Sequence, residues 1–251
     1  SHIVLNAHKI NAGELITLDN KNKDFFFFEK KDVRSVMGAL VYLVKTRLPE
    51  YIGASPFEIQ VLTPMRKGEL GVEHLNEVLQ YYLNPASESK KEKEGRTGVF
   101  REGDKVMQVK NNYKLEWKIT NAKGFSIEEG LGVFNGDMGI IKQINTYSER
   151  ITVVFDENRE AEYPFSSLDE LELAYAITIH KSQGSEYPAV VLPLLSGPPI
   201  LCNRNLLYTA ITRAQKCVAI AGRQSMVEQM IHNETEQKRY SGLNDCLKEG
   251  L

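Results

Sequence analysis

A dense run of hydrogen-bonding side chains follows directly on a stretch of alternating large apolar residues. The run, at positions 178–186, contains Thr178, His180, Lys181, Ser182, Gln183, Gly184, Ser185 and Glu186. Before it, large apolar residues recur at every second position from Leu171 to Ile179, which predicts a buried strand. Ligands of open α/β sheets bind beyond the carboxyl ends of their strands. We therefore expect the segment 178–186 to bind a ligand rather than to form a plain turn.

A second set of polar residues lies in a helix predicted at 203–214. Asn205, Thr209 and Arg213 recur at intervals of four residues and form one stripe. A neighbouring stripe consists of Arg204, Tyr208 and Thr212. Amides, hydroxyls and guanidinium groups suit specific hydrogen bonding better than the Lys and Glu of an ordinary solvated helix face. We expect this helix, the segment 178–186 and a third polar loop at 63–68 to converge on one site.

Alternating strands and helices are predicted to position these loops. In the first part of the chain we predict a helix at 2–12, with Ile3, Val4, Ala7 and Ile10 on one face, and a strand at 24–29. An amphipathic helix is predicted from Val33 to Leu48, ending before Pro49. A strand from Phe57 to Leu62 and a helix at 72–83 follow. The last part predicts strands at 189–195 and 217–221 and a helix from Ser225 to about Lys238. This alternation indicates an α/β layer architecture.

The pattern changes in the middle of the chain. Residues 84–98 are charged and lack an apolar period, which predicts an exposed, mobile connection; binding of nucleic acid by its lysines is the alternative. From 99 to 167, short strands alternate with turns such as 135–137 and 156–159, which predicts a small antiparallel barrel. Trp117 is expected to anchor the side of this barrel or a long loop between 111 and 130. The predicted domains are 1–98 with 168–251, interrupted by the barrel at 99–167.

The composition limits the classes of function. The 31 basic and 33 acidic residues balance, so nucleic acid would have to bind at a local patch. Cys202, Cys217 and Cys246 lack metal-ligand spacing and fit a reducing cytoplasm. No apolar run reaches the roughly 18 residues of a membrane span, and no signal peptide opens the chain. Because the chain begins at Ser1 without an initiator Met, we interpret it as a piece of a longer protein.

Several motifs resemble those of a known family. The segments LELAYAITIHKSQGSE at 171–186 and RNLLYTAITRAQK at 204–216 are similar to motifs V and VI of superfamily 1 helicases. The segments VLTPMRKGELGVEHLN at 61–76, FREGDKVMQVKNNY at 100–113 and VFNGDMGII at 133–141 narrow the resemblance to the RecD-like DNA helicases. The resemblance covers residues 3–222. It implies a second RecA-like motor domain, with a parallel sheet of the P-loop-NTPase type and helices on both faces, interrupted by an SH3-like barrel.

The resemblance also implies an activity and its partners. Members of the family use ATP and Mg²⁺ to translocate 5′→3′ along single-stranded DNA, in the bacterial cytoplasm and in DNA repair or recombination. The chain would act together with a first RecA-like domain, upstream in the same polypeptide. Nuclease or repair-complex subunits are further partners that the resemblance allows. No membrane partner is expected.

For the nucleotide, the resemblance implies roles at six positions. Arg213 and Arg66 would be arginine fingers on the γ-phosphate, a role that contributes on the order of 10³–10⁵ in rate. Glu186 would accept a hydrogen bond from the ribose, Gly184 would let the backbone approach the ligand, and Gln183 and Lys181 would lie on the nucleotide side. A capping charge at a helix end is the alternative for Arg213.

For DNA, the resemblance implies contacts from two parts of the chain. Thr63, Thr178, His180 and Ser182 would contact phosphates or bases. In the barrel, Asn112 would touch single-stranded DNA and Tyr113 would stack on a base. For His180 the alternative is a supporting role within its loop. For the two barrel residues a purely structural role is the alternative.

The chain lacks the phosphate-binding sequence of ATPases. No G-x-x-x-x-G-K-[ST] occurs. The apolar residues 151–155 before Asp156 and Glu157 imitate a magnesium-binding strand, but they lie in the barrel pattern and lead into a hairpin turn. We therefore expect the P-loop and the magnesium carboxylates upstream, and we expect this piece alone to bind neither ATP nor Mg²⁺ and to be inactive as an ATPase.

Two other functions stay open at this point. The chain can be a nucleic-acid-binding or docking module without motor activity, or it can come from the helicase subunit of an exonuclease complex. A P-loop and an Asp-Glu strand upstream would favour the motor, and their absence would favour the module.

Overall fold

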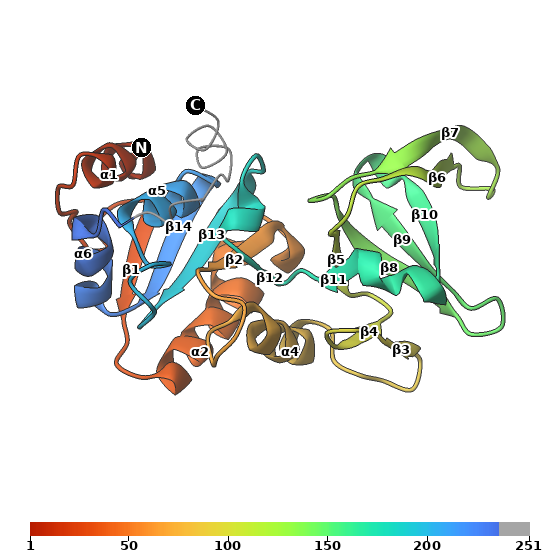
Figure 1. The fold of residues 1–251 in the computed structure, drawn as a ribbon, viewed down its shortest axis with the longest axis horizontal. Helices are drawn as coiled ribbons and strands as arrows, with labels where there is room; N and C mark the ends of the chain where they lie inside the picture. The colour runs from red at the N-terminus through yellow and green to blue at the C-terminus, as the bar shows by residue number, and fades with distance from the viewer. Residues whose placement is uncertain (236–251) are drawn as a thin grey trace, which may run out of the picture.

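The computed structural model describes residues 1–235 of the chain and places two β-sheets side by side, joined through the middle of the molecule (Figure 1). The helix predicted to run from Ser225 to about Lys238 ends earlier, at His232, where Asn233 leaves the helical conformation. Cys246 lies outside the described residues. No helix within the described residues is long and apolar enough to cross a membrane.

The first sheet has five strands, and all neighbouring pairs are parallel. Its order is β1 (Phe25–Glu29), β14 (Ala214–Gly222), β13 (Tyr187–Leu194), β2 (Ile59–Thr63) and β12 (Ala176–Thr178). Alternate side chains of a strand point to opposite faces. In β13, Val190 and Leu192 therefore enter one hydrophobic cluster, whereas Ala189 and Val191 enter another. Such two-sided burial is typical of a parallel sheet between two layers of helices.

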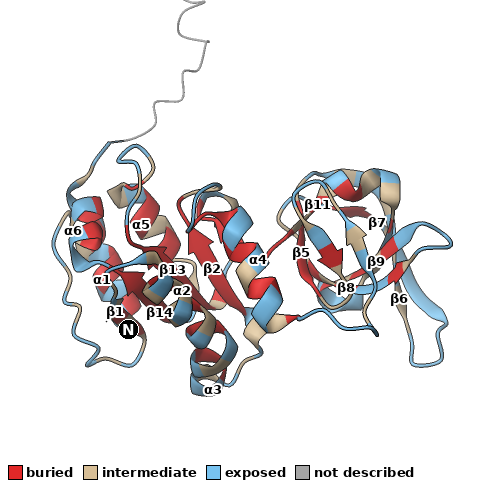
Figure 2. Ribbon diagram, turned by 90° about the horizontal axis from the view of Figure 1, so that it is seen from below, coloured by how far each residue is buried: buried red, intermediate tan, exposed pale blue. Residues whose placement is uncertain are grey.

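Helices cover both faces of this sheet, as the fold class predicted. One face carries α1 (His2–Asn11), α5 (Arg204–Ile211) and α6 (Gln224–His232). The other carries α2 (Val33–Tyr42), the π-helical turn η1 (Leu43–Arg47), α3 (Leu48–Ile52) and α4 (Val72–Leu83). Figure 2 shows the buried strands enclosed between these helices.

The second sheet is antiparallel and has seven strands, which confirms the predicted all-β insertion. Its order is β11 (Leu171–Leu173), β5 (Lys105–Gln108), β8 (Met138–Asn145), β9 (Arg150–Phe155), β10 (Glu160–Pro164), β6 (Asn112–Thr120) and β7 (Ser126–Val133). Its core contains Ile141, Ile151, Val153 and Tyr163. Asp156–Asn158 (η3) form the turn between β9 and β10, as expected for the segment that imitates a magnesium-binding strand. A second turn, Phe165–Glu170 (η4), leads into β11.

The strand predicted from Leu171 to Ile179 is in fact two short strands in different sheets, so that prediction was wrong. β11 pairs with β5 in the antiparallel sheet, and β12 pairs with β2 in the parallel sheet. The chain crosses between the sheets at Ala174 and Tyr175. Asn76 of α4 compensates for the interrupted ladder, because its side chain bonds the backbone of Leu173 and Ala176 at 2.8–3.0 Å. Period-two spacing shows which way side chains alternate and does not show where a strand changes sheet.

The long helix predicted to stop before Pro49 continues beyond it. The chain widens into the π-helical turn η1 and then forms α3, in which Pro49 is the second residue. Near the start of a helix the missing N–H of proline costs little. The helix ends instead at Gly53, whose φ of 66° is the left-handed conformation that glycine adopts readily.

Three smaller expectations also need correction. Val4 is 56% exposed, because the inner face of α1 is formed by Ile3, Asn6, Ala7 and Ile10. The strand expected from Phe57 begins at Ile59, since Pro56–Glu58 form a 3₁₀ turn, η2, with a capping box. Part of the charged connection 84–98 is a strand: β3 (Glu92–Glu94) pairs with β4 (Val99–Arg101). Arg101 and Glu92 join these strands through an ion pair of 2.6 Å.

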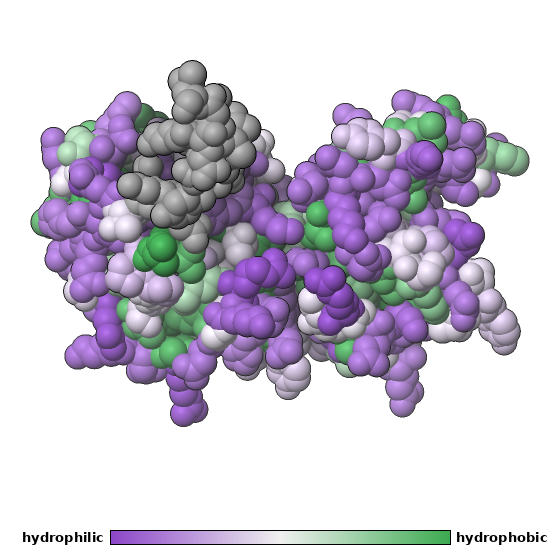
Figure 3. Space-filling view, viewed as in Figure 1, coloured by the Kyte–Doolittle hydropathy of each residue, from purple (hydrophilic) through white to green (hydrophobic). Residues whose placement is uncertain are grey.

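The long loop expected between residues 111 and 130 is a hairpin of β6 and β7. Trp117 lies opposite Gly130 in this hairpin, and its ring occupies the space that a side chain at Gly130 would need. In the space-filling view, hydrophobic side chains lie at the outer end of the hairpin (Figure 3), where Phe125 and Ile127 are exposed.

Candidate functional site

The predicted site residues lie at two opposite ends of the parallel sheet. β2 and β12 end side by side at Thr63 and Thr178, whereas β13 and β14 begin side by side at Tyr187 and Ala214. The register of β13 on β2 separates the carboxyl end of β2 from the amino end of β13 by about six residues along the strands, or roughly 20 Å at 3.3 Å per residue. The expectation that the three polar segments converge is therefore wrong: the loop after β2 lies far from Arg213.

Arg213 lies in the turn between α5 and β14, at the amino end of the strands. The predicted helix to Ala214 is shorter, because α5 ends at Ile211 and Thr212 is its C-cap. The Arg213 guanidinium donates from Nη1 to the backbone oxygen of Ser185 at 3.2 Å and from Nη2 to Thr212 Oγ1 at 3.5 Å. Its Nε is buried and has no hydrogen-bond partner among the described residues. A buried donor without a partner is costly, and the described residues supply no acceptor for this one.

Glu186 and Gly184 share this end of the sheet with Arg213. The Glu186 carboxylate is exposed and accepts a hydrogen bond from Gln215 Nε2 at 3.2 Å. Gly184 has a φ of 84° and open space around it, so its conformation requires glycine and its backbone is accessible. Burial raises the pKa of Tyr187, and the Ser185 hydrogen bond and the Arg213 charge act in the opposite direction. The amino end thus combines a fixed guanidinium with an exposed carboxylate and an accessible backbone.

The hydroxyl groups predicted to contact DNA are buried at the carboxyl end. Thr63 Oγ1 donates to the Leu70 oxygen at 2.7 Å, and Ser182 Oγ donates to the Ile179 oxygen at 2.6 Å. Thr178 Oγ1 accepts from the backbone N–H of Lys181 at 3.3 Å. All three side chains are buried, and each hydroxyl forms a hydrogen bond within its own loop.

His180 and Lys181 lie in the 3₁₀ turn η5 (His180–Ser182) that follows β12. His180 is exposed, Lys181 is half-buried, and Gln183 just after the turn is exposed. Among the predicted DNA contacts at this end, His180 is therefore the one whose side chain is at the surface.

Arg66 follows the carboxyl end of β2 and is paired with Glu172. Its Nη2 lies 3.3 Å from both Glu172 carboxylate oxygens. The Arg66 side chain is 40% exposed and that of Glu172 is 18% exposed. The structure thus does not bring Arg66 together with Arg213.

The two predicted barrel residues have different surroundings. Asn112 Nδ2 donates to the Glu170 carboxylate at 3.0 and 3.2 Å, and Glu170 also accepts from Gln108 Nε2 at 2.9 Å. Asn112 is therefore held within the barrel's own hydrogen bonds. Tyr113 is 67% exposed, and its ring meets that of Phe134 edge-on with centroids 5.5 Å apart.

A buried carboxylate that the sequence reasoning missed lies between the two sheets. Asp104 accepts hydrogen bonds from Gln80 Nε2 at 2.7 Å, Asn84 Nδ2 at 2.8 Å, Tyr175 Oη at 2.8 Å and the Arg101 backbone at 2.6 Å. Burial raises its pKa, whereas these hydrogen bonds act to lower it. The sequence shows Gly103-Asp104 as turn residues, and nothing in its periodicity marks the carboxylate as buried.

A buried lysine, also missed, lies beside Asp104. Lys105 Nζ donates to Gln60 Oε1 at 2.8 Å, and Gln60 Nε2 donates to the backbone oxygens of Ala174 and Tyr175 at 3.2 and 3.3 Å. Burial lowers the pKa of Lys105 to about 7. Lysine is rarely buried, so its residue type alone gave no sign of this position.

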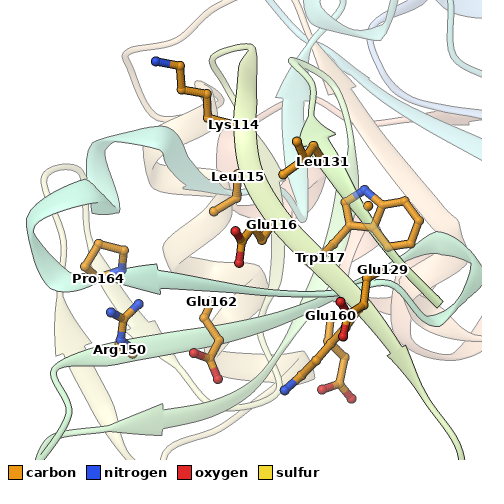
Figure 4. Close-up of a pocket in the computed structure, with 12 residues that line it drawn as sticks. Lys114, Leu115, Glu116, Trp117, Glu129, Leu131, Arg150, Glu160, Glu162 and Pro164 are labelled. Atoms are coloured by element: carbon orange, nitrogen blue, oxygen red, sulfur yellow. The ribbon is translucent and has the colours of Figure 1, made fainter. Parts of the chain in front are cut away.

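A groove of about 620 Å³ runs along the barrel between the β6–β7 hairpin and β10 (Figure 4). Trp117 and Leu131 lie on the hairpin side, and Glu162 and Pro164 lie on β10. Its charged residues have both signs, so the groove points to no particular ligand. Within residues 1–235, no group of three or more His, Cys, Asp or Glu side chains is placed to hold a metal ion.

Two known protein families match successive parts of the chain. Residues 75–155 match the family model of the ATP-dependent RecD-like DNA helicase SH3 domain, and residues 173–221 match that of the UvrD-like helicase C-terminal domain. The second range contains β12, the segment 178–186, and Arg213.

Several proteins are similar in sequence. The ATP-dependent RecD2 DNA helicase of Deinococcus radiodurans is 39% identical over 167 residues, which are 66% of this chain and 20% of that protein. The RecBCD enzyme subunit RecD of Mycolicibacterium smegmatis is 30% identical over 191 residues, 76% of this chain and 29% of that protein. The chain also resembles a crystal structure of Pif1 helicase from Bacteroides in complex with ADP-AlF3 and ssDNA, with 18% sequence identity and a TM-score of 0.48. The match covers 98% of this chain and 53% of the Pif1 chain.

The chain spans only 20% and 29% of the length of these two sequence relatives. Within that span, an SH3 domain specific to RecD-like helicases is followed by a helicase C-terminal domain in one continuous chain. The chain therefore belongs to the RecD-like DNA helicases.

Proposed function

We propose that the chain is the second motor domain of an ATP-dependent helicase that moves 5′→3′ along single-stranded DNA. ATP binds at the amino end of the parallel sheet, and DNA binds at its carboxyl end. The observation that carries the proposal is the buried, unpartnered Nε of Arg213 beside the exposed Glu186. Both residues lie in the range that matches the helicase C-terminal domain.

Arg213 has the properties of an arginine finger. Its Nη1 contact of 3.2 Å places the guanidinium beside the backbone at Ser185, and Nη2 lies 3.5 Å from the Thr212 hydroxyl. A guanidinium offers a planar fork of donors to phosphate oxygens, and such a residue contributes on the order of 10³–10⁵ in rate. Arg213 stabilises the charge that develops on the γ-phosphate during transfer to water.

Glu186 and Gly184 complete the nucleotide side. The exposed carboxylate accepts a hydrogen bond from the ribose, and the glycine gives the ligand access to the backbone. Gln183 lies between these residues and the turn η5 and belongs to the same side. Lys181 lies within η5, at the carboxyl end, and we assign it to the DNA side together with His180.

The segment 178–187 connects the two ends of the sheet. It leaves β12 beside Thr63 and enters β13 beside Ala214. A displacement of Arg213 acts on Ser185 through their hydrogen bond and so reaches His180 along a short stretch of chain. This path couples the nucleotide at one end to DNA at the other, which is what a translocating motor requires.

The site is completed by another domain. No P-loop sequence occurs in the chain, so the phosphate cradle and the Mg²⁺ ligands come from a first RecA-like domain in the same polypeptide. The isolated chain is accordingly inactive as an ATPase. Because several relatives are named RecBCD enzyme subunit RecD, assembly with nuclease subunits is the alternative to a free-standing helicase.

Arg213→Ala in the full-length protein tests the proposal. We expect DNA-stimulated ATP hydrolysis to fall by at least about 10³-fold, while affinity for single-stranded DNA stays close to that of the wild type. Arg223→Ala is a matched control: Arg223 also bonds a backbone oxygen, that of Lys31 at 2.7 Å, but at the far end of β14. Near-normal turnover by Arg213→Ala, or an equal loss in the control, would contradict the role.

A further inference from the structure

The ion pair between Arg66 and Glu172 lies at the carboxyl end of the sheet and has no role in the nucleotide site. Arg66 is in the loop that follows β2, and Glu172 is in β11 of the antiparallel sheet. Both line a groove of about 240 Å³ along α4, together with Glu73, Asn76 and Glu77. The pair thus faces an open space rather than the core.

The geometry of this pair is that of a weak contact. One nitrogen, Nη2, serves both carboxylate oxygens at 3.3 Å, whereas a strong arginine–carboxylate pair uses two nitrogens at about 2.7–2.9 Å. Within the described residues, no hydrogen bond joins Arg66 Nε or Nη1 to another group. The guanidinium keeps donors free and is partly exposed to solvent.

A phosphate is the group that would use those free donors. A phosphate, like a carboxylate in a strong pair, can engage two guanidinium nitrogens at once, which Glu172 does not do here. Arg66 adjoins the end of the sheet at which the proposed function places DNA, and His180 follows the neighbouring strand.

We propose that Glu172 holds Arg66 when DNA is absent, and that a phosphate of single-stranded DNA displaces Glu172 when DNA binds. Glu172 is then a competing residue that lowers the affinity for DNA, and Arg66 is a DNA contact rather than a second arginine finger. This inference rests on the proposed function, because it requires DNA at the carboxyl end.

Removing the competitor should strengthen DNA binding. The full-length protein without nucleotide is titrated into a fluorescently labelled oligothymidylate, and Kd is measured by anisotropy. We expect Glu172→Gln to lower Kd about two- to fivefold, which is the range of an exposed ion pair. Glu73→Gln is the matched control, because it removes a carboxylate from the same groove without touching the Arg66 side chain.

Arg66 variants separate a phosphate contact from a general effect of charge. We expect Arg66→Ala to raise Kd and to reduce the slope of log Kd against log salt by about 0.7, the value for one phosphate on a single strand. In the Arg66→Ala background, Glu172→Gln should have no effect. Arg66→Lys should keep the salt slope of the wild type. That result would show that the changed slope of Arg66→Ala does not come from misfolding.

The outcomes distinguish this inference from the proposed function. An equal gain in DNA affinity in Glu172→Gln and Glu73→Gln, or a gain that persists in the Arg66→Ala background, would overturn the proposed competition. The helicase proposal would still stand in that case, provided that the wild type binds DNA. A wild-type protein that does not bind the oligothymidylate would overturn both.

Discussion

Replacing Lys105 by methionine should make the chain more stable at neutral pH, and the gain should shrink as the pH rises. Lys105 is buried between the two sheets with Gln60 as its hydrogen-bond partner. Burial lowers its pKa from 10.5 to about 7, and the carboxylate of Glu58 opposes this without compensating for it. The folded chain therefore resists protonation of this amine, whereas the unfolded chain takes up the proton freely.

The sign and size of the effect follow from proton linkage. Between about pH 7 and pH 10 the unfolded state binds more protons at this residue, so wild-type stability rises with pH. At 1.36 kcal/mol per pH unit, the fall from 10.5 to about 7 corresponds to roughly 5 kcal/mol in total, of which about 2 kcal/mol falls between pH 7 and pH 9 because the folded amine is half protonated at pH 7. The thioether that Lys105→Met introduces cannot titrate, so the variant lacks this dependence.

Urea unfolding at several pH values measures the effect, and fluorescence of the single tryptophan, Trp117, reports on the barrel sheet. The substitution also leaves Gln60 Oε1 without its donor, which costs about 1–3 kcal/mol, but that cost does not vary with pH. Lys123→Met, at an exposed turn position, controls for the loss of a surface charge. If the difference between Lys105→Met and the wild type were the same at pH 7 and pH 9, a buried neutral lysine would be excluded.

Two further substitutions test the packing of the sheets. Gly130→Ala should destabilise the chain by about 1–3 kcal/mol and change the Trp117 emission, because the new Cβ would overlap the indole ring. An unchanged urea midpoint and emission would refute this packing. Asn20→Ala removes two hydrogen bonds, of 2.6 and 2.5 Å, to the backbone of Phe27 on the edge strand β1, and should cost about 1–3 kcal/mol. Asn20 would thereby cover the free edge of β1, and an uncovered edge strand can pair with other chains. The variant should therefore also sediment as larger species, and a purely monomeric variant would contradict this role of Asn20.

The sequence predicted the layers of this fold well because hydrophobic periodicity reports burial directly. The strand β13, the helix α4 and the antiparallel insertion were all predicted from apolar spacing. The division of Leu171–Ile179 between two sheets does not, because both strands keep the same period. It depends on Asn76, one hundred residues away from Ala176, whose side chain replaces the ladder bonds at the crossing.

The candidate site was less predictable because residue type does not show which way a side chain points. Thr63 and Ser182 have hydroxyls that suit a ligand, yet each bonds a backbone oxygen of its own loop. Arg66 and Arg213 both have the chemistry of a phosphate contact, and only the register of β13 on β2 shows that they lie at opposite ends.

Hydrogen bonds and packing hold the two sheets together at their junction. Asp104 lies at the start of the barrel sheet, but Gln80, Asn84 and Tyr175, which bond it, belong to α4, its C-cap and the crossing segment. Separating the sheets would strip a buried carboxylate of these partners, and each lost hydrogen bond to a charged group costs about 1.5–3 kcal/mol. One continuous hydrophobic cluster also runs from the helices of the parallel sheet into the barrel. We therefore expect any displacement of the parallel sheet to carry the barrel with it, together with the exposed Tyr113 and Phe134.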